Sequence, residues 1–257
     1  MKKFINLLKV KDINHKLLRI GSKYDGGYIV SDTVSKKTDT LISFGAEDNI
    51  DFELHFLKKF KPKDILLFDK SFSKTKSNKK IKFFKKKISY KKTKNTETIN
   101  NILKKINSKN ITLKMDIEFS EWKILETIDE KDLKCFDQIL IEFHLFLIDL
   151  PYEFNSLTRY FKKYTKQNIH TINQEILINM YFKILKKIQK YFYLFHLSPN
   201  NSLKVKKFNK VEYPQLLELS FVNKKFINKV KNLNKKYPIK NLDFPNKYYK
   251  SDVSFKY

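Results

Sequence analysis

The chain has 257 residues, a formal net charge of +27 and 41% hydrophobic residues. This length is sufficient for a full hydrophobic core, and the composition argues against global disorder. The single cysteine, Cys135, excludes an intramolecular disulfide and is typical of a reducing compartment. The most apolar run, 139–150, is too short to span a membrane, and the first residues lack a signal-peptide pattern. We therefore expect one α/β domain over residues 1–257, located in the cytoplasm.

The positive charge is the feature that invites a nucleic-acid interpretation. Lysine, asparagine and isoleucine are enriched together, whereas arginine occurs only at Arg19 and Arg159, as expected for a very AT-rich coding sequence. Arginine is the usual residue for bidentate contacts to phosphate and guanine. The lysines are also spread along the chain, apart from a dense run at 74–94, and spread charge supports only non-specific binding. We predict no specific nucleic-acid partner.

Residues 1–30 are expected to form an N-terminal arm that ends in a glycine turn. Residues 1–18 have the apolar spacing of a short helix, and RIGSKYDGGYIV at 19–30 contains two extended pieces around Gly26 and Gly27. The glycine pair permits positive φ and a close approach of the backbone to a ligand, although an ordinary hairpin turn has the same pattern. The chain has only four glycines, all in this region or the next motif, so each is expected where other residues cannot fit.

Residues 40–60 have the pattern that opens a nucleotide-binding unit. Thr40 to Phe44 predicts a buried strand, Gly45 a turn, and phenylalanines four apart predict a helix from Asp51. The turn has one glycine and is acidic, because Glu47 follows it, so it would repel a pyrophosphate. The pattern therefore favours a cationic ligand that carries an amino acid, such as S-adenosylmethionine, over NAD.

A second strand, at 64–69, ends in Asp69. This carboxylate stands about 20 residues after the glycine turn, where an acid commonly holds a ribose diol. A basic connection with a short strand at 81–88 follows, and residues 96–106 predict a helix. A strand-ending aspartate in an ordinary turn is common, so only its pairing with Gly45 indicates a ligand site.

The stretch 111–128, ITLKMDIEFSEWKILETI, predicts a buried strand, an acidic tip and a helix. Asp116 and Glu118 are two residues apart, which in extended backbone places both carboxylates on one side. Ser120 is expected to cap the helix. Ligands of open α/β sheets bind beyond the carboxyl ends of the strands, so this tip is a candidate site, with a solvated acidic loop as the alternative.

The next strand, at 136–147, carries Glu142 and His144 on one face at its C-terminal end, beside Asp116 in a doubly wound sheet. Helices are expected at 152–167 and 174–190. A further strand at 191–201 ends in a polar group that includes His196, and a last strand at 214–223 is expected to pair with it in antiparallel fashion. The basic tail, 224–257, is expected to wrap the domain surface.

Together these motifs show a resemblance to a known family. KMDIEFSEWKIL resembles the signature of FkbM-like S-adenosylmethionine-dependent methyltransferases, and the order of RIGSKYDGGYIV, SFGAEDNIDFE, LIEFH and FHLSPNN resembles the methyltransferase-like 24 type. The resemblance spans roughly residues 19–223 and implies a class I methyltransferase fold with its core at 40–223. That fold is a Rossmann-like sheet of seven strands, six parallel and the last antiparallel, with helices on both faces.

The resemblance also implies which residues bind S-adenosylmethionine. Gly45, Ala46 and Glu47 would lie beside its methionine part, Asp69 would hold the ribose and Asp116 would lie by the methyl group. The full implied set is Asp25, Gly26, Gly27, Tyr28, Phe44, Gly45, Ala46, Glu47, Glu53, Asp69, Lys70, Asp116, Ile117 and Glu118. One departure is Phe119, because the family usually has glycine after the DIE sequence.

The leading hypothesis is methyl transfer to an oxygen of a small or sugar-like molecule. A histidine, His144 or His196, is expected to act as base, with Asp116 and Glu142 orienting the methyl acceptor or the base. The implied acceptor-binding set is Glu142, His144, His196, Asn200 and Asn201. A resident metal is not expected. The alternative mechanism places a divalent cation on Asp116, Glu142 and His144, and activity that survives EDTA unchanged would exclude it.

Two other classes of function stay open. One is an RNA or protein methyltransferase that uses the basic surface, and the other is a non-catalytic α/β binding module. The resemblance implies a bacterial enzyme of surface-glycan or natural-product biosynthesis, such as capsule or lipooligosaccharide assembly. No residue identifies the methyl acceptor.

Overall fold

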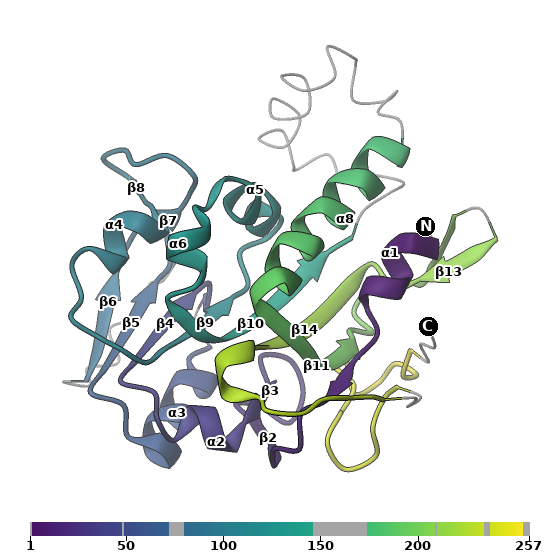
Figure 1. Ribbon diagram of the computed structural model, residues 1–257, viewed down its shortest axis with the longest axis horizontal. Coiled ribbons are helices and arrows are strands. Elements are labelled where there is room, and N and C mark those ends of the chain that lie inside the picture. The colour runs from purple at the N-terminus through teal and green to yellow at the C-terminus, as the bar shows by residue number, and fades with distance from the viewer. Residues whose placement is uncertain are drawn as a thin grey trace.

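The computed structural model describes residues 2–47, 49–71, 80–145, 174–208, 210–233 and 237–253, and it is built around a seven-stranded sheet (Figure 1). In spatial order the strands are β11 (Phe192–Pro199), β14 (Leu216–Asn223), β10 (Phe136–His144), β9 (Ile111–Met115), β4 (Thr40–Phe44), β5 (Asp64–Phe68) and β6 (Ile81–Phe84). Strand β14 is antiparallel to both neighbours, and the other strands run parallel to one another. The expected class I methyltransferase fold is confirmed.

The chain order reverses at β4, which lies between β5 and β9. Phe44 pairs in register with Phe68 on one side and with Met115 on the other, so these three strands end at the same level. The carboxyl ends of parallel strands at such a switch point form the crevice in which α/β proteins bind ligands. Gly45, Asp69 and Asp116 are the residues that follow these three strand ends.

Helices cover both faces of the sheet (Figure 1). One face carries α1 (Lys2–Leu7), α4 (Ile99–Leu103), α5 (Ser120–Thr127), α6 (Glu130–Leu133) and α8 (Gln174–Tyr191). The other carries α2 (Asp32–Ser35), α3 (Asp51–Phe60) and a hairpin of β2 (Leu17–Ile20) and β3 (Tyr28–Ser31). The turn of this hairpin contains Gly26 and Gly27.

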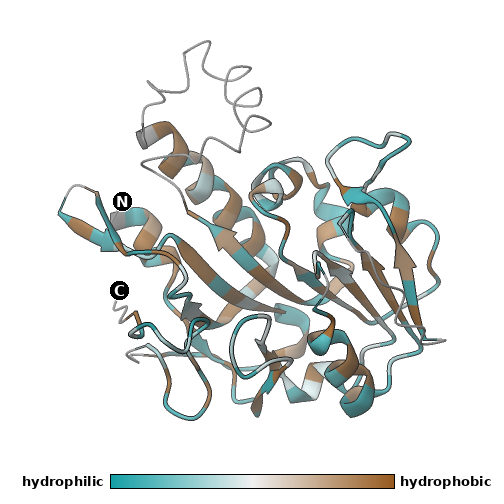
Figure 2. Cartoon of the chain, turned by 180° about the vertical axis from the view of Figure 1, so that it is seen from behind, coloured by the Kyte–Doolittle hydropathy of each residue, from teal (hydrophilic) through white to brown (hydrophobic). Residues whose placement is uncertain are grey.

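The core follows from the two-residue period of the strands. In β5, Leu66 and Phe68 pack into the larger core cluster, whereas Ile65 and Leu67 pack into a second cluster on the opposite face. The phenylalanines of α3 join the second cluster. Figure 2 shows hydrophobic stretches along the central strands, with polar residues at some positions. Such apolar stretches are typical of strands that are buried on both faces.

Several predicted elements needed correction. Helix α4 is shorter than the helix predicted at 96–106, because Thr96 and Glu97 form strand β8 and the Thr98 hydroxyl accepts a hydrogen bond from the Asn101 N–H at 3.3 Å as a cap. The strand predicted at 81–88 is interrupted, with β7 (Lys87–Ile88) pairing with β8. Ser120 is the first residue of α5 and not its cap. The helix predicted at 152–167 lies outside the described residues.

Described parts of the tail lie against the rest of the chain. In the tail, β15 (Lys231–Asn232) pairs with β1 (Lys11–Asp12). Before the tail, β12 (Lys206–Phe208) and β13 (Val211–Tyr213) form a separate hairpin. A short 3₁₀ helix, Lys224–Phe226, follows β14. The Asn246 amide donates to a carboxylate oxygen of Glu218 at 2.7 Å. Among the described residues, no helix combines the length and apolar character needed to cross a membrane.

Candidate active site

A cavity of about 800 Å³ opens at the carboxyl ends of β4, β5, β9 and β10. The hairpin turn between β2 and β3 and the tail residue Lys247 complete its wall. Of the predicted site residues, those that line it are Asp25, Gly26, Gly45, Ala46, Glu47, Asp69, Lys70, Asp116, Ile117, Glu118, Glu142, His144 and Asn200. The structure therefore brings together residues from six separate segments of the chain.

Gly45 is the point at which the turns after β4 and β9 touch. Its φ is +76°, and a Cβ at this position would lie 1.6 Å from the Asp116 carbonyl oxygen. Both the backbone conformation and the space exclude a side chain, which explains why a glycine-poor sequence has one here. The Lys114 ammonium donates a hydrogen bond to the Gly45 carbonyl.

Asp69 connects the turn after β5 to the turn after β4 through hydrogen bonds. Its Oδ2 accepts hydrogen bonds from the Ala46 and Glu47 N–H groups, each at 2.8 Å, and its Oδ1 accepts from the N–H and the hydroxyl of Ser71, each at 2.6 Å. Burial by itself raises the pKa of Asp69, but these hydrogen bonds outweigh it, and the net shift is downward. Asp69 is therefore ionised at neutral pH.

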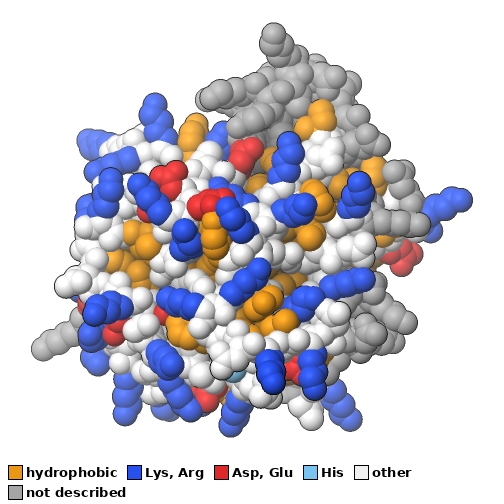
Figure 3. Space-filling model, in the orientation of Figure 1, with side chains coloured by type: hydrophobic (Ala, Val, Ile, Leu, Met, Phe, Trp, Pro, Cys, Tyr) orange, Lys and Arg blue, Asp and Glu red, His pale blue; other side chains and the backbone are white. Residues whose placement is uncertain are grey.

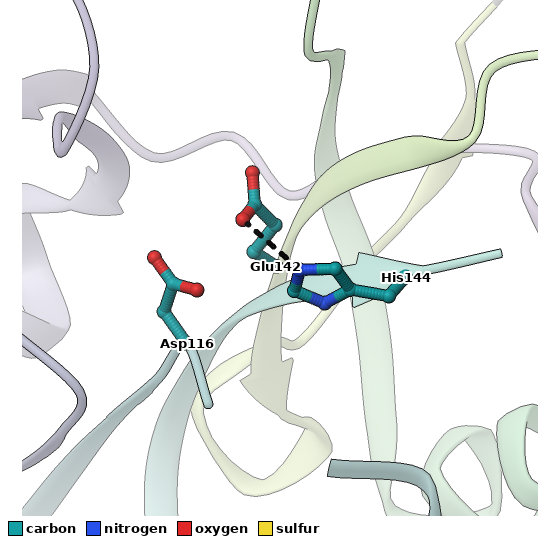
Figure 4. Close-up of side chains that lie close together, drawn as sticks. All are labelled: Asp116, Glu142 and His144. Atoms are coloured by element: carbon teal, nitrogen blue, oxygen red, sulfur yellow. Dashed lines mark ion pairs between the residues drawn. The ribbon is translucent and has the colours of Figure 1, made fainter. Parts of the chain in front are cut away.

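Asp116, Glu142 and His144 also line the cavity and lie close together, and we call them the acceptor cluster after the role expected for them (Figure 4). Asp116 follows β9, and the other two residues stand near the end of the adjacent strand β10. One side-chain oxygen or nitrogen of each residue lies within 4.8 Å of those of the other two. Glu142 is 7% exposed and His144 3% exposed, so the cluster places ionisable groups in a largely buried position.

The His144 ring is held between carboxylates. Its Nδ1 lies 2.8 Å from Oε1 of Glu121, and its Nε2 lies 3.2 Å from Oε2 of Glu118 and 3.7 Å from Oε2 of Glu142. Burial lowers the pKa of His144, but the attraction of Glu121 and the hydrogen bonds to Glu118 and Glu121 raise it well above its usual range. With these neighbours His144 carries its proton at neutral pH.

The two carboxylates of the acceptor cluster each have one hydrogen-bonding partner. The Asn200 amide donates to Oε1 of Glu142 at 2.6 Å, and the Tyr28 hydroxyl donates to Oδ2 of Asp116 at 3.0 Å. Burial and repulsion by Asp116 raise the pKa of Glu142 well above its usual range. Burial and the same aspartate raise the pKa of Tyr28, so its hydroxyl stays protonated as a donor.

The turn between β9 and α5 has a strained backbone. Glu118 and Phe119 have positive φ angles of 48° and 70°, a region that costs a residue with a side chain about 1–2 kcal/mol. Phe119 thus adopts the conformation that a glycine would take at this position, although it replaces the glycine usual in the resembling family. Its buried ring lies 5.1 Å from the His144 ring, centroid to centroid. Phe119 in place of glycine therefore keeps the turn and packs an aromatic ring beside His144.

Some predicted site residues do not line the cavity. His196 is buried with Asp243 of the tail, whose Oδ1 lies 2.9 Å from its Nε2, and Asn201 donates to the tail carbonyls of Lys247 and Lys250 at 3.0 and 3.1 Å. The prediction that His196 and Asn201 contact the acceptor is therefore corrected. The cavity-lining set also lacks Gly27, Tyr28, Phe44 and Glu53. Glu53 instead accepts a hydrogen bond from the Ser43 hydroxyl.

Sequence reasoning missed Glu121, which is fully buried and holds both the backbone N–H and the ring of His144. The signal was an acid in the first turn of the helix next to Trp122, whose Nε1 donates to the His144 carbonyl at 2.8 Å. It also missed four lysines of the wall, Lys86, Lys87, Lys114 and Lys247. Lys114 lies on a strand that otherwise reads as apolar, and Lys247 comes from the tail.

Comparison with curated proteins gives no match. Among solved structures, the fibrillarin pre-rRNA processing protein of Methanococcus jannaschii is 10% identical, with 82% of this chain and 83% of that chain covered and a TM-score of 0.37. A precorrin-6y C5,15-methyltransferase of Geobacter metallireducens is 7% identical, covering 74% of this chain and 86% of that one, with a TM-score of 0.35. At these scores the likeness carries no inference about activity.

Comparison with protein families identifies the family of the chain, which the solved structures do not. The methyltransferase FkbM domain matches residues 26–168, which is more than half of the chain. The match begins in the glycine turn and includes the ends of β4, β5, β9 and β10, where the cavity opens. The chain therefore belongs to the FkbM methyltransferase family.

Proposed function

We propose that the protein transfers a methyl group from S-adenosylmethionine to a hydroxyl oxygen of a sugar or another small molecule. The observation that supports this proposal is one continuous cavity at the switch point of the sheet. The cavity is lined both by the Gly45 turn with Asp69 and by the acceptor cluster. Cofactor and methyl acceptor would thus meet above adjacent strand ends.

The residues of the cavity fit S-adenosylmethionine. A volume of about 800 Å³ lies within the usual range of small-ligand pockets. Asp69 is ionised and would hold the ribose hydroxyls, while Gly45, Ala46 and Glu47 would lie along the methionine part. The lining combines carboxylates with five lysines, and the carboxylates of the turns after β4 and β9 suit a sulfonium cation. When bound, S-adenosylmethionine supplies an electrophilic methyl group.

The acceptor cluster supplies what a hydroxyl acceptor needs. Methyl transfer is an in-line displacement, so much of the rate comes from holding the hydroxyl oxygen near the methyl carbon. Glu142, fixed by Asn200, would orient the hydroxyl. Because His144 keeps its proton, we assign the base to the Asp116 carboxylate and a charge-stabilising role to His144. This revises the expectation of a histidine base.

A small acceptor fits better than RNA or another polyanion. The lysines of the described residues are scattered over the visible surface among apolar and neutral groups and do not form one continuous patch (Figure 3). The buried carboxylates of the acceptor cluster would repel a phosphate backbone. The membership in the FkbM family supports a hydroxyl of a surface glycan or a natural product as the acceptor.

Calorimetric titration with S-adenosylhomocysteine, the product form of the cofactor, tests the proposal. We expect micromolar binding to the wild type and at least 100-fold weaker binding to Asp69→Asn, because hydrogen bonds to a charged group contribute roughly 1.5–3 kcal/mol each. Asp64→Asn is the matched control, since Asp64 lies at the opposite end of β5 and pairs with Lys82 on the surface. A wild type that does not bind the compound would refute the proposed activity.

A further inference from the structure

We propose that Asp116, Glu142 and His144 bind a divalent metal ion, which holds the hydroxyl of the methyl acceptor. The binding site itself stands on the geometry of the acceptor cluster, whereas the role of the ion in methyl transfer rests on the proposed function. The cluster combines two carboxylates with an imidazole, contributed by the ends of two neighbouring strands.

The spacing of the three side chains suits a common ion. Ligand atoms that surround one small divalent cation at about 2.1 Å lie roughly 3–4 Å from one another. The candidate ligand atoms here lie within 4.8 Å of one another. Figure 4 shows the three side chains converging on one region from two strands. Small side-chain adjustments would therefore bring all three to bonding distance.

Each candidate ligand also has a dedicated outer partner. Nδ1 of His144 is held by Glu121, and Nε2 faces Oε2 of Glu118 at 3.2 Å and Oε2 of Glu142 at 3.7 Å. Oε1 of Glu142 is held by Asn200, and Oδ2 of Asp116 by Tyr28. Metal-ligating histidines almost always donate their second ring N–H to a carboxylate or carbonyl, and ligating carboxylates are themselves hydrogen-bonded. All three residues of the acceptor cluster have this arrangement.

The charge of the cluster points to a cation as well. Within the described part of the chain, no lysine or arginine forms an ion pair with Asp116 or Glu142, although the chain carries 54 such residues. Glu118 adds a third carboxylate beside His144, and Glu218 lies opposite Glu142 on β14. A divalent ion bound between these side chains would compensate this negative charge.

The donor set selects the class of ion and leaves room for the acceptor. Two carboxylates and one imidazole suit Mn²⁺ or Zn²⁺, and Mg²⁺ more weakly, because imidazole is a softer ligand than oxygen. Three protein ligands leave open positions at an octahedral ion. With the ion bound, Asp116 is one of its ligands and not the base, and a hydroxyl bound to the ion loses its proton to solvent more readily. Its oxygen then forms the C–O bond as the C–S bond breaks, which yields a methyl ether and S-adenosylhomocysteine.

Titration with MnCl₂ alone tests the site without any activity assay. Calorimetry would give the stoichiometry and affinity, and the emission of Trp122 would report the place of binding. Trp122 is the sole tryptophan of the chain and is hydrogen-bonded to the His144 carbonyl. The test variant is Glu142→Gln. The matched control is Asp137→Asn, a buried acid at the opposite end of β10 that pairs with Lys225 at 2.6 Å.

We expect one Mn²⁺ per chain, a change in Trp122 emission with the same midpoint, at least tenfold weaker binding to Glu142→Gln and unchanged binding to Asp137→Asn. Absence of binding at millimolar Mn²⁺, or equal affinity in Glu142→Gln and wild type, would overturn the metal site. Binding of S-adenosylhomocysteine, measured on the same samples, separates the two proposals. It also shows that Glu142→Gln is folded.

Discussion

His144 and His196 look alike in the sequence and differ in what surrounds them. Both are nearly fully buried, both lie in strands of the same sheet, and both have a carboxylate oxygen within 3 Å of a ring nitrogen. The surroundings of His144 open into the cavity and include Glu142 and Glu118. His196 instead faces Asp243 of the tail and the Tyr237 ring.

The comparison shows that a buried histidine beside an acid is not by itself a site. In both cases a carboxylate beside the imidazole lessens the cost of removing a polar ring from water. Only His144 also borders space that a ligand can enter. The acceptor cluster and the tail contact of His196 are therefore expected to respond differently to substitution, the first in binding and the second in stability.

The largest expected effect is on the tail side. Asp243→Ala removes the carboxylate beside the buried His196 ring and the acceptor of the Ile239 N–H, and each buried polar group left without its partner costs roughly 1–3 kcal/mol of the free energy of unfolding. Urea denaturation would measure the loss. The affinity for S-adenosylhomocysteine at 25 °C should stay within twofold of wild type, and a much weaker affinity at intact fold would place His196 in the site after all.

Glu218 lies between the two regions, on the strand that separates β10 from β11, and its response to pH tests how strongly they are coupled. Burial raises the pKa of Glu218 to about 7, against the attraction of Arg19 and the hydrogen bond from Asn246. The folded protein binds the Glu218 proton more tightly than the unfolded chain does. The contribution of Glu218 to stability is therefore fully present below the pKa of the unfolded chain and is lost as the pH rises through about 7.

Glu218→Gln resembles the protonated form, so it should equal wild type at pH 4 and be about 3 kcal/mol more stable at pH 9. Denaturant unfolding at the two pH values measures the difference. A constant difference between the proteins across this range would mean that Glu218 is ionised in the fold throughout. Asp64→Asn serves as the control, because Asp64 lies at the surface in an ion pair with Lys82.

The neighbouring asparagines sharpen the comparison further, because each belongs to one region. Asn201→Ala loses hydrogen bonds to the tail backbone and should cost about 2 kcal/mol of unfolding free energy without changing Mn²⁺ binding. Asn200→Ala frees Glu142 and should weaken Mn²⁺ binding about tenfold or more. Unfolding and MnCl₂ titration of both variants give the test, and identical profiles would contradict the division into two regions.

The smallest effect is expected at Glu118, whose side chain is 67% exposed although it contacts His144. Exposed ion pairs contribute at most about 1 kcal/mol, so Glu118→Gln should change the free energy of unfolding by less than that. Thermal unfolding at neutral pH measures it. A larger loss would indicate that the carboxylate is desolvated in solution.

Much of the fold was predictable because its signals are local. The strand at 40–44 was predicted at its observed bounds, and the stretch 111–128 was predicted to open with a buried strand, since buried strands are short apolar runs that end at glycine or acidic residues. The acceptor cluster was also predictable in outline. Asp116, Glu142 and His144 end consecutive parallel strands, and such strands are usually neighbours in a doubly wound sheet.

What only the tertiary structure decided lies in contacts between distant segments. Asp243 and His196 are far apart in the sequence, and neither residue carries a local mark of the other, so the sequence could not tell which histidine borders the cavity. The inward position of Glu121 depends on how α5 packs over the end of β10. The positive φ of Phe119 depends on the surrounding fold as well, because its intrinsic preference is against that conformation. Periodicity along the chain determines which residues are buried, whereas the packing of separate segments determines which buried groups face a ligand.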